Sequence, residues 1–119
     1  MTADKLIELI DASIEDNPFY SREAILALIQ SGEAQLWNTD NSILVTELIK
    51  NNQSGALSIQ VVVGGGELSE IIPGLTTQAE QWAKSLGAKK ARFDGRPGWV
   101  RAMRSYGYHE VSRTAEKDL

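Results

Sequence analysis

The chain has no cysteine and only one histidine, His109. A chain without cysteine has no disulfide, no thiolate-bound metal or cluster and no cysteine nucleophile. With one histidine, we expect neither a Ser-His-Asp triad nor a metal site made by the protein alone. No apolar run approaches the ~20 residues that a membrane helix needs, and the first residues do not read as a secretory signal. These absences predict a cytoplasmic protein with no membrane partner.

What remains is the composition of a folded domain. Of the 119 residues, 42% are hydrophobic and 24% are charged, which is ordinary for a globular chain. A chain of this length has room for one hydrophobic core. We therefore predict a single domain that spans residues 1–119.

Charge is distributed unevenly along the chain. Residues 1–70 hold 11 acidic and 3 basic side chains, whereas residues 71–119 hold 5 acidic and 9 basic ones. This asymmetry is typical of an anion site or of a contact between unlike halves of two copies, although solvated faces of two helices and a strand would give the same counts. A net charge of −4 and a pI near 5.0 argue against a nucleic-acid partner.

Two amphipathic helices are predicted at the N-terminal end. Apolar residues recur at helical spacing from Leu6 to Ile14, after Thr2 as the cap, and Asn17 with the following proline ends this helix. Ser21 caps a second helix, which Gly32 closes.

Three strand-like runs follow, separated by short turns. They cover Ala34–Trp37, Ile43–Ile49 and Leu57–Val63, and the third alternates apolar with polar residues. Short turns favour antiparallel neighbours.

Helices alternate with strands in the rest of the chain. The predicted elements are a helix that starts in Glu67–Ile72 before a proline, a helix from Leu75 to Leu86, a strand over Lys89–Asp94, a helix from Pro97 and an edge strand over Tyr108–Lys117. The strand–helix–strand order requires at least one parallel pairing. The elements together predict an α+β (α/β sandwich) fold, in which a mixed, mostly antiparallel central sheet carries helices on both faces.

This order of elements is similar to that of the GNAT superfamily, the acyl-CoA-dependent N-acetyltransferases, with the usual first strand missing. The segment Ala79–Phe93 resembles the family passage of a helix, a Leu-Gly-Ala sequence and a strand. The segment Met103–Val111 resembles the family helix that ends in a Gly-Phe pair, which is Gly107-Tyr108 in this chain. Gly95–Tyr108 also resembles small GNAT-like proteins of tailed bacteriophages and prophages.

The resemblance implies an acetyl-CoA site on the third strand run and the loop after it. In the family this strand lends backbone groups to the pantetheine arm, which implicates Val61, Val63, Gly64, Gly65 and Gly66 here. The glycines allow close approach of a ligand to the backbone, and they are equally consistent with a bulge or turn.

The loop itself departs from the family pattern. The family wraps the pyrophosphate with amide N–H groups at a helix N-terminus and carries an Arg or Gln, whereas this chain has Glu67 and Glu70 there. Negative charge beside phosphates is unfavourable, so acetyl-CoA, the one cofactor that the resemblance implies, is expected to bind weakly or not at all.

Acyl transfer to an amine needs an acid for the departing thiolate and a base for the ammonium. The family often places a tyrosine four residues before the Gly of the Gly-Phe pair, but that position is Met103 here and cannot donate a proton. Tyr106 and Tyr108 are the substitutes, provided that the helix end is rearranged. Glu47 and His109 are the candidate bases. The simpler interpretation is that Glu47 lies on an exposed face of the sheet and that His109 is a surface or packed residue.

Arg96 and Trp99 form a distinctive pair at the start of the last predicted helix. An arginine before a helix N-terminus can bind an anion or a carboxylate, and a tryptophan can supply an apolar face. The alternative is a rigid start of the helix with Trp99 in the core, which accounts for the tryptophan but not for the arginine.

Two functions from different classes remain. The departures at the coenzyme loop and at Met103 favour a GNAT-like protein that has lost catalysis and acts as a binding or assembly module, with a protein or a second copy as its partner. If phage-encoded, it would work in the host cytoplasm or the virion. The alternative is an active small N-acetyltransferase that transfers acetyl from acetyl-CoA to an amine.

Overall fold

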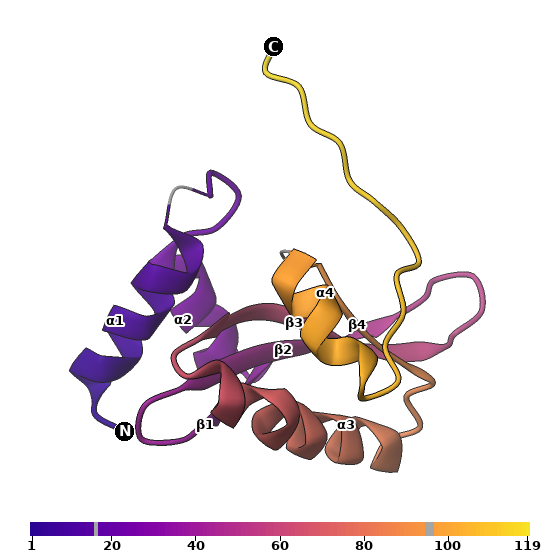
Figure 1. Cartoon of the computed structure of the whole chain (residues 1–119), viewed down its shortest axis with the longest axis horizontal. Coiled ribbons are helices and arrows are strands. Elements are labelled where there is room, and N and C mark those ends of the chain that lie inside the picture. Colours follow the sequence, from indigo (N-terminus) through magenta and orange to yellow (C-terminus); the bar gives the residue numbers. More distant parts are fainter. Residues whose placement is uncertain (16, 95–96) are drawn as a thin grey trace.

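A four-stranded mixed sheet organises the described part of the chain, which comprises residues 1–15, 17–94 and 97–119 of a computed structural model (Figure 1). Its strands lie in the order β1 (Ala34–Asn38), β2 (Ile43–Lys50), β3 (Leu57–Gly65) and β4 (Lys90–Phe93). The first three pair antiparallel, and β4 pairs parallel to β3. The predicted mixed, mostly antiparallel sheet is therefore confirmed.

One face of the sheet is covered by α1 (Ala3–Ile14) and α2 (Arg22–Ser31). Both helices begin at the predicted caps, because Thr2 accepts a hydrogen bond from a backbone N–H three residues on and Ser21 does the same, each at 3.1 Å. The apolar sides of the two helices pack with inward residues of the sheet, which include Ile43, Val45 and Val63.

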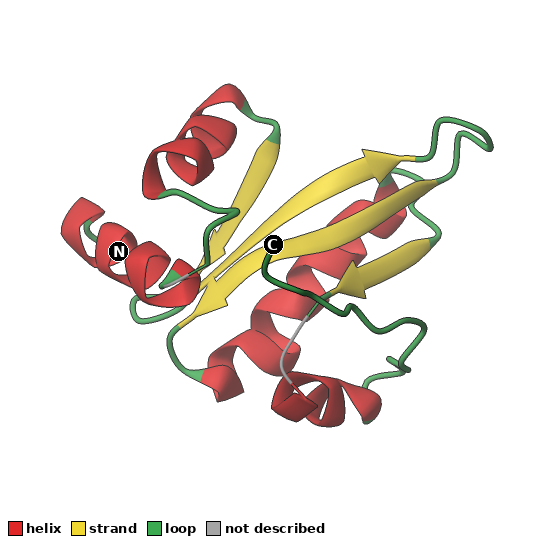
Figure 2. Cartoon of the chain, turned by 90° about the horizontal axis from the view of Figure 1, so that it is seen from above, coloured by secondary structure: helices red, strands yellow, loops and turns green. Residues whose placement is uncertain are grey.

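The other face is covered by α3 (Thr76–Ser85) and α4 (Pro97–Arg104), so helices lie on both sides of the sheet as predicted (Figure 2). Leu44 and Ile59 of the sheet pack there with apolar residues of α3 and with Met103 of α4, which is 1% exposed. Alternate residues of β2 thus pack into two separate cores, one on each face of the sheet, which explains why the strand is almost continuously apolar.

The segment between β3 and α3 begins as predicted. Helical structure starts at Leu68, within the expected Glu67–Ile72, but it continues as a wide turn over Glu70–Leu75 with a kink at Ile72, and regular helix resumes at Thr76. The physical reason is Pro73, because the residue before a proline is disfavoured in the helical region. Ile72 accordingly has extended angles, with φ −117° and ψ 112°.

The predicted last strand, Tyr108–Lys117, is wrong. Within the described residues, no backbone hydrogen bond joins residues 109–119 to any other part of the chain. Val111 is the one large apolar side chain between His109 and Lys117. Pairing would therefore bury little apolar surface to offset the entropy lost on ordering this tail.

Candidate functional site

The strand implicated in coenzyme binding has a free stretch of backbone. Both edges of β3 are paired from Ser58 to Val61, but β4 ends there, and the β4-side edge of the remaining residues has no strand partner among the described residues. The pairing with β2 also shifts by one, so that Val62 is an extra residue between two paired ones. The predicted positions Val61 and Val63 flank this bulge.

The three glycines that follow are used for packing within the protein. A Cβ on Gly64 would lie 2.7 Å from Cη2 of Trp99, and a Cβ on Gly65 would lie 3.0 Å from a backbone oxygen of α1. Gly66 has φ +110°, and a Cβ there would lie 2.4 Å from the backbone oxygen of Asn41. The chain's own atoms therefore account for the absence of side chains at these positions.

A buried serine holds the next part of the loop. The hydroxyl of Ser42, which is 0% exposed, accepts the backbone N–H of Glu67 at 2.9 Å and donates to the carboxylate of Glu70 at 2.7 Å. Thr39 donates a second, longer hydrogen bond of 3.3 Å to the same carboxylate oxygen. A negative charge is thus fixed in the loop that the resemblance assigns to pyrophosphate.

Several backbone donors of the loop and the turn after it are also engaged, although no partner is seen for the N–H groups of Leu68 and Ser69 among the described residues. The N–H groups of Glu70 and Ile71 donate to the carbonyl of Glu67, and the N–H of Thr76 donates to carbonyls of the wide turn. Anion binding at a helix start needs several N–H groups without a protein partner. The engaged donors are therefore not free to receive a phosphate in this conformation.

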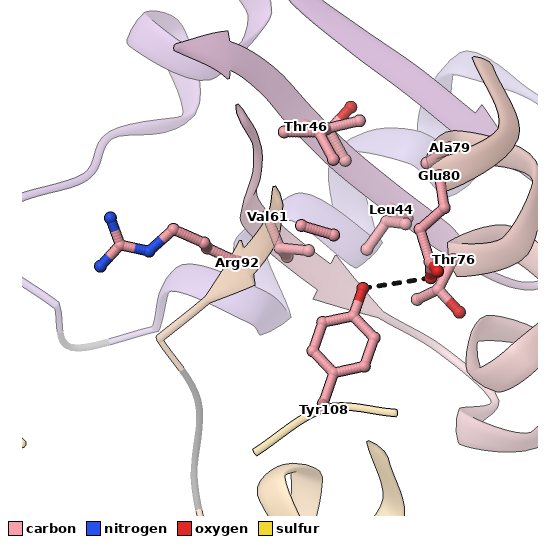
Figure 3. Close-up of a pocket in the computed structure, with 10 residues that line it drawn as sticks. Leu44, Thr46, Val61, Thr76, Ala79, Glu80, Arg92 and Tyr108 are labelled. Carbon is pink, nitrogen blue, oxygen red and sulfur yellow. Dashed lines mark hydrogen bonds between the residues drawn. The ribbon is translucent and has the colours of Figure 1, made fainter. Parts of the chain in front are cut away.

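Tyrosine and carboxylate meet at the end of α4. The hydroxyl of Tyr108 donates to the carboxylate of Glu80 on α3 at 3.1 Å, and its ring packs against Phe93 with centroids 5.5 Å apart (Figure 3). Burial, with the charge and hydrogen bond of Glu80, raises the pKa of Tyr108 well above its usual range. Burial also raises the pKa of Glu80, against the opposing effect of the hydrogen bond from Tyr108.

A small cavity lies beside this pair, between the sheet and α3. Its volume of about 10 Å³ holds roughly one water molecule, and it is partly open to the surface. The lining residues are Leu44, Thr46, Ile59, Val61, Thr76, Ala79, Glu80, Ala91, Arg92 and Tyr108. Tyr108 and Glu80 also line a much larger open groove, together with residues 61–66.

Glu80 was not found by reading the sequence. A signal was present, because Thr76, Glu80 and Ala83 recur at helical spacing beside the apolar stripe of this helix. That spacing places a carboxylate at the border of a buried face.

Of the other predicted acid–base residues, Tyr106 and His109 line the same open groove as Tyr108, but Glu47 does not. Thr46 lines the cavity, and because neighbouring residues of a strand point to opposite faces, Glu47 lies on the α1/α2 side of the sheet. Tyr106 is 49% exposed, and His109 is exposed at the start of the tail. The structure therefore brings Tyr108 together with Glu80 but not with Glu47.

Of the predicted pair at the start of α4, Arg96 lies outside the described residues. Trp99 is half-buried and packs against Gly64 and Phe93, with 6.4 Å between the two aromatic centroids. Its position favours the packing role that the sequence left open.

The described part of the chain shows neither a metal-binding cluster nor a membrane-spanning helix. Residues 1–15, 17–94 and 97–119 contain no group of three or more histidine, aspartate or glutamate side chains placed to hold a metal ion. None of the helices formed by these residues is long and apolar enough to cross a membrane.

Comparison with known proteins identifies the fold. No family model matches the chain, and no curated protein matches its sequence. An acetyltransferase from Trypanosoma brucei matches its structure with a TM-score of 0.69 and 13% identity, over 98% of this chain and 92% of the other. Glucosamine-6-phosphate N-acetyltransferase from Arabidopsis thaliana matches with a TM-score of 0.70 and 12% identity, over 99% and 94% of the two chains. AAC(6')-Iy, solved with a CoA-containing bisubstrate analogue, matches with a TM-score of 0.71 and 11% identity, over 98% and 90%.

These matches cover almost the whole chain at low sequence identity. The chain therefore has the GNAT acetyltransferase fold, as the order of its elements predicted. Identity of 11–13% shows the fold alone, so activity has to be argued from the site.

Proposed function

We propose that the chain is a noncatalytic binding or assembly module built on the GNAT fold. The observation that carries the proposal is the carboxylate of Glu70, which Ser42 and Thr39 hold by their hydroxyls in the loop assigned to the coenzyme pyrophosphate. A pyrophosphate in that loop would meet this fixed charge and the side chain of Glu67. Each unit charge at 4 Å costs about 1–4 kcal/mol near a protein surface.

The hydrogen bonds of the loop support the same conclusion. If Glu70 moved aside, the buried hydroxyl of Ser42 would have no acceptor for its proton, although it would still accept the N–H of Glu67. A buried polar group without a partner costs about 1–3 kcal/mol. Coenzyme binding therefore has to overcome both charge repulsion and the loss of the loop's own bonds.

The acid position adds a second argument. Met103 is 1% exposed and packs in the core between the sheet and the helices α3 and α4, so it has a structural role there. Tyr108 lies beside a cavity of about one water and already donates its proton to Glu80 in a hydrogen bond. Met103 therefore supplies no acid, and the hydroxyl of Tyr108, which lines a groove together with residues 61–66, is already bonded to Glu80.

The kind of assembly is proposed from the sequence. The resemblance of Gly95–Tyr108 to small proteins of tailed phages and prophages supports work in a phage particle or in a phage–host contact. A protein, or a second copy of this chain, would then be the partner.

Calorimetry with acetyl-CoA tests the proposal, together with a thiol-release assay against mixed amines. We expect no saturable heat at millimolar coenzyme and no thiol above the blank, while an active acetyltransferase of the same fold gives both signals in parallel. A saturable micromolar isotherm that free CoA competes away would contradict the proposal.

One observation favours the alternative, an active N-acetyltransferase. The β4-side edge of β3 lacks a strand partner beyond Val61 among the described residues, and that backbone is what the family uses to hold the pantetheine arm. In this alternative the amine attacks the thioester carbonyl, the C–S bond breaks, the ammonium proton passes to water in the open groove, and Tyr106 or Tyr108 protonates the thiolate. Steady thiol release that depends on one class of amine would support it.

A further inference from the structure

The outer edge of β1 is open. β1 is the first strand in the order of the sheet and pairs only with β2 among the described residues. The N–H of Thr39 donates to the carbonyl of Ser42 where this pairing begins, and bonded and unbonded positions alternate along an antiparallel pair. Ala34, Leu36 and Asn38 therefore direct their N–H and C=O groups away from β2. None of these groups has a backbone partner among the described residues.

β1 lacks the features that usually protect an edge strand, which are charge, proline or a bulge. The opposite edge of the sheet, on β4, carries the exposed side chains of Lys90 and Arg92. In contrast, Ala34–Asn38 contains neither a charged residue nor a proline, and its register with β2 is regular. Of the two edges, β1 is therefore the one suited to pairing with another strand.

The side chains of β1 are typical of an interior strand. Leu36 packs with the core on the α1/α2 face, and Trp37 packs with the core on the α3 face. There the ring of Trp37 meets that of Trp82 edge to face, with centroids 5.6 Å apart. Leu36 and Trp37 nevertheless remain only half-buried. Strands with apolar side chains on both faces usually lie inside a sheet, so one more strand beside β1 would extend both cores.

Hydrogen bonds between side chains hold this edge in one geometry. The indole N–H of Trp37 donates to the hydroxyl of Thr46 at 2.9 Å, and that hydroxyl donates to the side-chain oxygen of Gln35 at 3.0 Å. Thr46 itself is 0% exposed. Because these side chains are already ordered, the edge loses little conformational entropy when a strand binds to it.

We propose that the β1 edge pairs antiparallel with the β1 edge of a second copy, so that two four-stranded sheets become one continuous sheet. The register that uses all five residues of the strand pairs Leu36 with Leu36 of the other copy. In the same register Trp37 lies beside Gln35, and Ala34 lies beside Asn38. A two-fold axis perpendicular to the sheet relates the copies, so each core continues on the same face of the joined sheet.

The side chains make β1 complementary to itself. On the α1/α2 face, the two Leu36 side chains meet at the axis and extend the apolar cores of both copies. On the α3 face, the aliphatic stem of Gln35 covers the half-buried indole of Trp37 from the other copy. The bulky ring thus faces a slim side chain, and no two rings compete for the same space.

The charges next to the strand also permit this pairing. Glu33 precedes β1, and in the proposed register it lies beside Thr39 of the other copy. Asp40 follows the strand and lies beside Gly32 of the other copy. Like charges therefore do not face each other across the new pair of strands. An edge without charge selects a partner strand without charge, and β1 is itself such a strand.

This surface deepens the proposed binding role by naming one partner. Its test contains no coenzyme, so the dimer and the loss of coenzyme binding succeed or fail separately.

Disulfide cross-linking tests the register directly, because the chain has no cysteine of its own. A full-length chain with Ala34→Cys is mixed with a mass-tagged full-length chain with Asn38→Cys, and the mixture is oxidised gently. We expect the mixed dimer to dominate, because Cα atoms of facing residues lie about 4.5–5.5 Å apart and a disulfide needs about 4.4–6.8 Å. Each variant alone should give little dimer, because its two cysteines would lie about 13 Å apart along the strands.

Gln53→Cys, exposed in the loop between β2 and β3, is the matched control for this experiment. It should give little mixed dimer with Asn38→Cys. An equal yield from the control would overturn the proposal. So would the absence of mixed dimer between Ala34→Cys and Asn38→Cys chains that fold as the parent does by circular dichroism.

Sedimentation of variants without cysteine gives an independent readout. Asn38→Pro removes one outward N–H from each copy, while Asn38→Ala keeps it. Because Asn38 is exposed and its N–H points away from β2, both variants should fold as the parent does. We expect the proline variant to raise the dimer dissociation constant about tenfold or more, and the alanine variant to change it much less. A parent chain that stays monomeric at high concentration, or equal effects of the two variants, would contradict the proposal.

Discussion

Ser42 and Glu70 are joined across 28 positions of sequence by a hydrogen bond of 2.7 Å from the serine hydroxyl to the carboxylate. This bond ties the start of β2 to the wide turn before α3. It fixes a negative charge where the family resemblance expects a coenzyme phosphate, and it underlies the proposal of a noncatalytic module.

Removing the hydroxyl should loosen this turn. Ser42→Ala leaves the carboxylate of Glu70 and the N–H of Glu67 each short of a partner at a fully buried position. We expect a loss of about 1–3 kcal/mol in the free energy of unfolding, measured by urea denaturation. Ser69→Ala, at an exposed position of the same loop, should stay within about 0.5 kcal/mol, and equal effects of the two changes would show that the bond is unimportant.

Gly64 and Trp99 should show a coupled effect on stability. Gly64→Ala places a Cβ 2.7 Å from Cη2 of the indole and should cost about 1–3 kcal/mol through overpacking. In a Trp99→Phe background the ring is shorter, so the same change should cost much less. Urea unfolding of the parent, the two single variants and the double variant measures the coupling. Additive losses in the free energy of unfolding would mean that the two residues have no steric interaction.

Glu80 should make stability depend on pH. Its pKa is raised above the ordinary value of 4.5, so between that value and the folded pKa the folded state holds more protons than the unfolded state, and stability falls as the pH rises. Glu80→Gln removes the titration but still accepts the hydroxyl of Tyr108. Its stability relative to the parent should therefore increase from pH 4.5 toward neutrality.

Tyr108→Phe is the matched control for this profile. Loss of the hydroxyl removes the hydrogen bond that lowers the pKa of Glu80, so the fall in stability with pH should become steeper. Unfolding curves of parent and Glu80→Gln that stay parallel across this range would contradict the assignment.

Much of the fold could be predicted from sequence because local signals agree with the final packing. Thr2 and Ser21 cap the helices that they were expected to cap, and the alternation over Leu57–Val63 does form a strand. These elements are specified by capping residues and by hydrophobic periodicity, and both can be recognised from a short stretch of sequence.

The errors concern residues whose partners are distant. The pattern over Tyr108–Lys117 suits a strand, but pairing depends on what another edge offers, which no local pattern contains. The Glu70 carboxylate could be placed in the loop, but its hydroxyl partner Ser42 lies 28 positions earlier, just before β2. Glu80 similarly becomes significant only when α4 brings Tyr108 beside it.

The most direct test of the central claim is a titration of the folded protein with acetyl-CoA, followed by the backbone amide signals of residues 64–71 in two-dimensional NMR. If Glu70 and its hydroxyl partners close the coenzyme site, these signals should not move at millimolar acetyl-CoA. Saturable shifts of the glycine and Glu67 amides at micromolar coenzyme would contradict that claim and favour an active acetyltransferase.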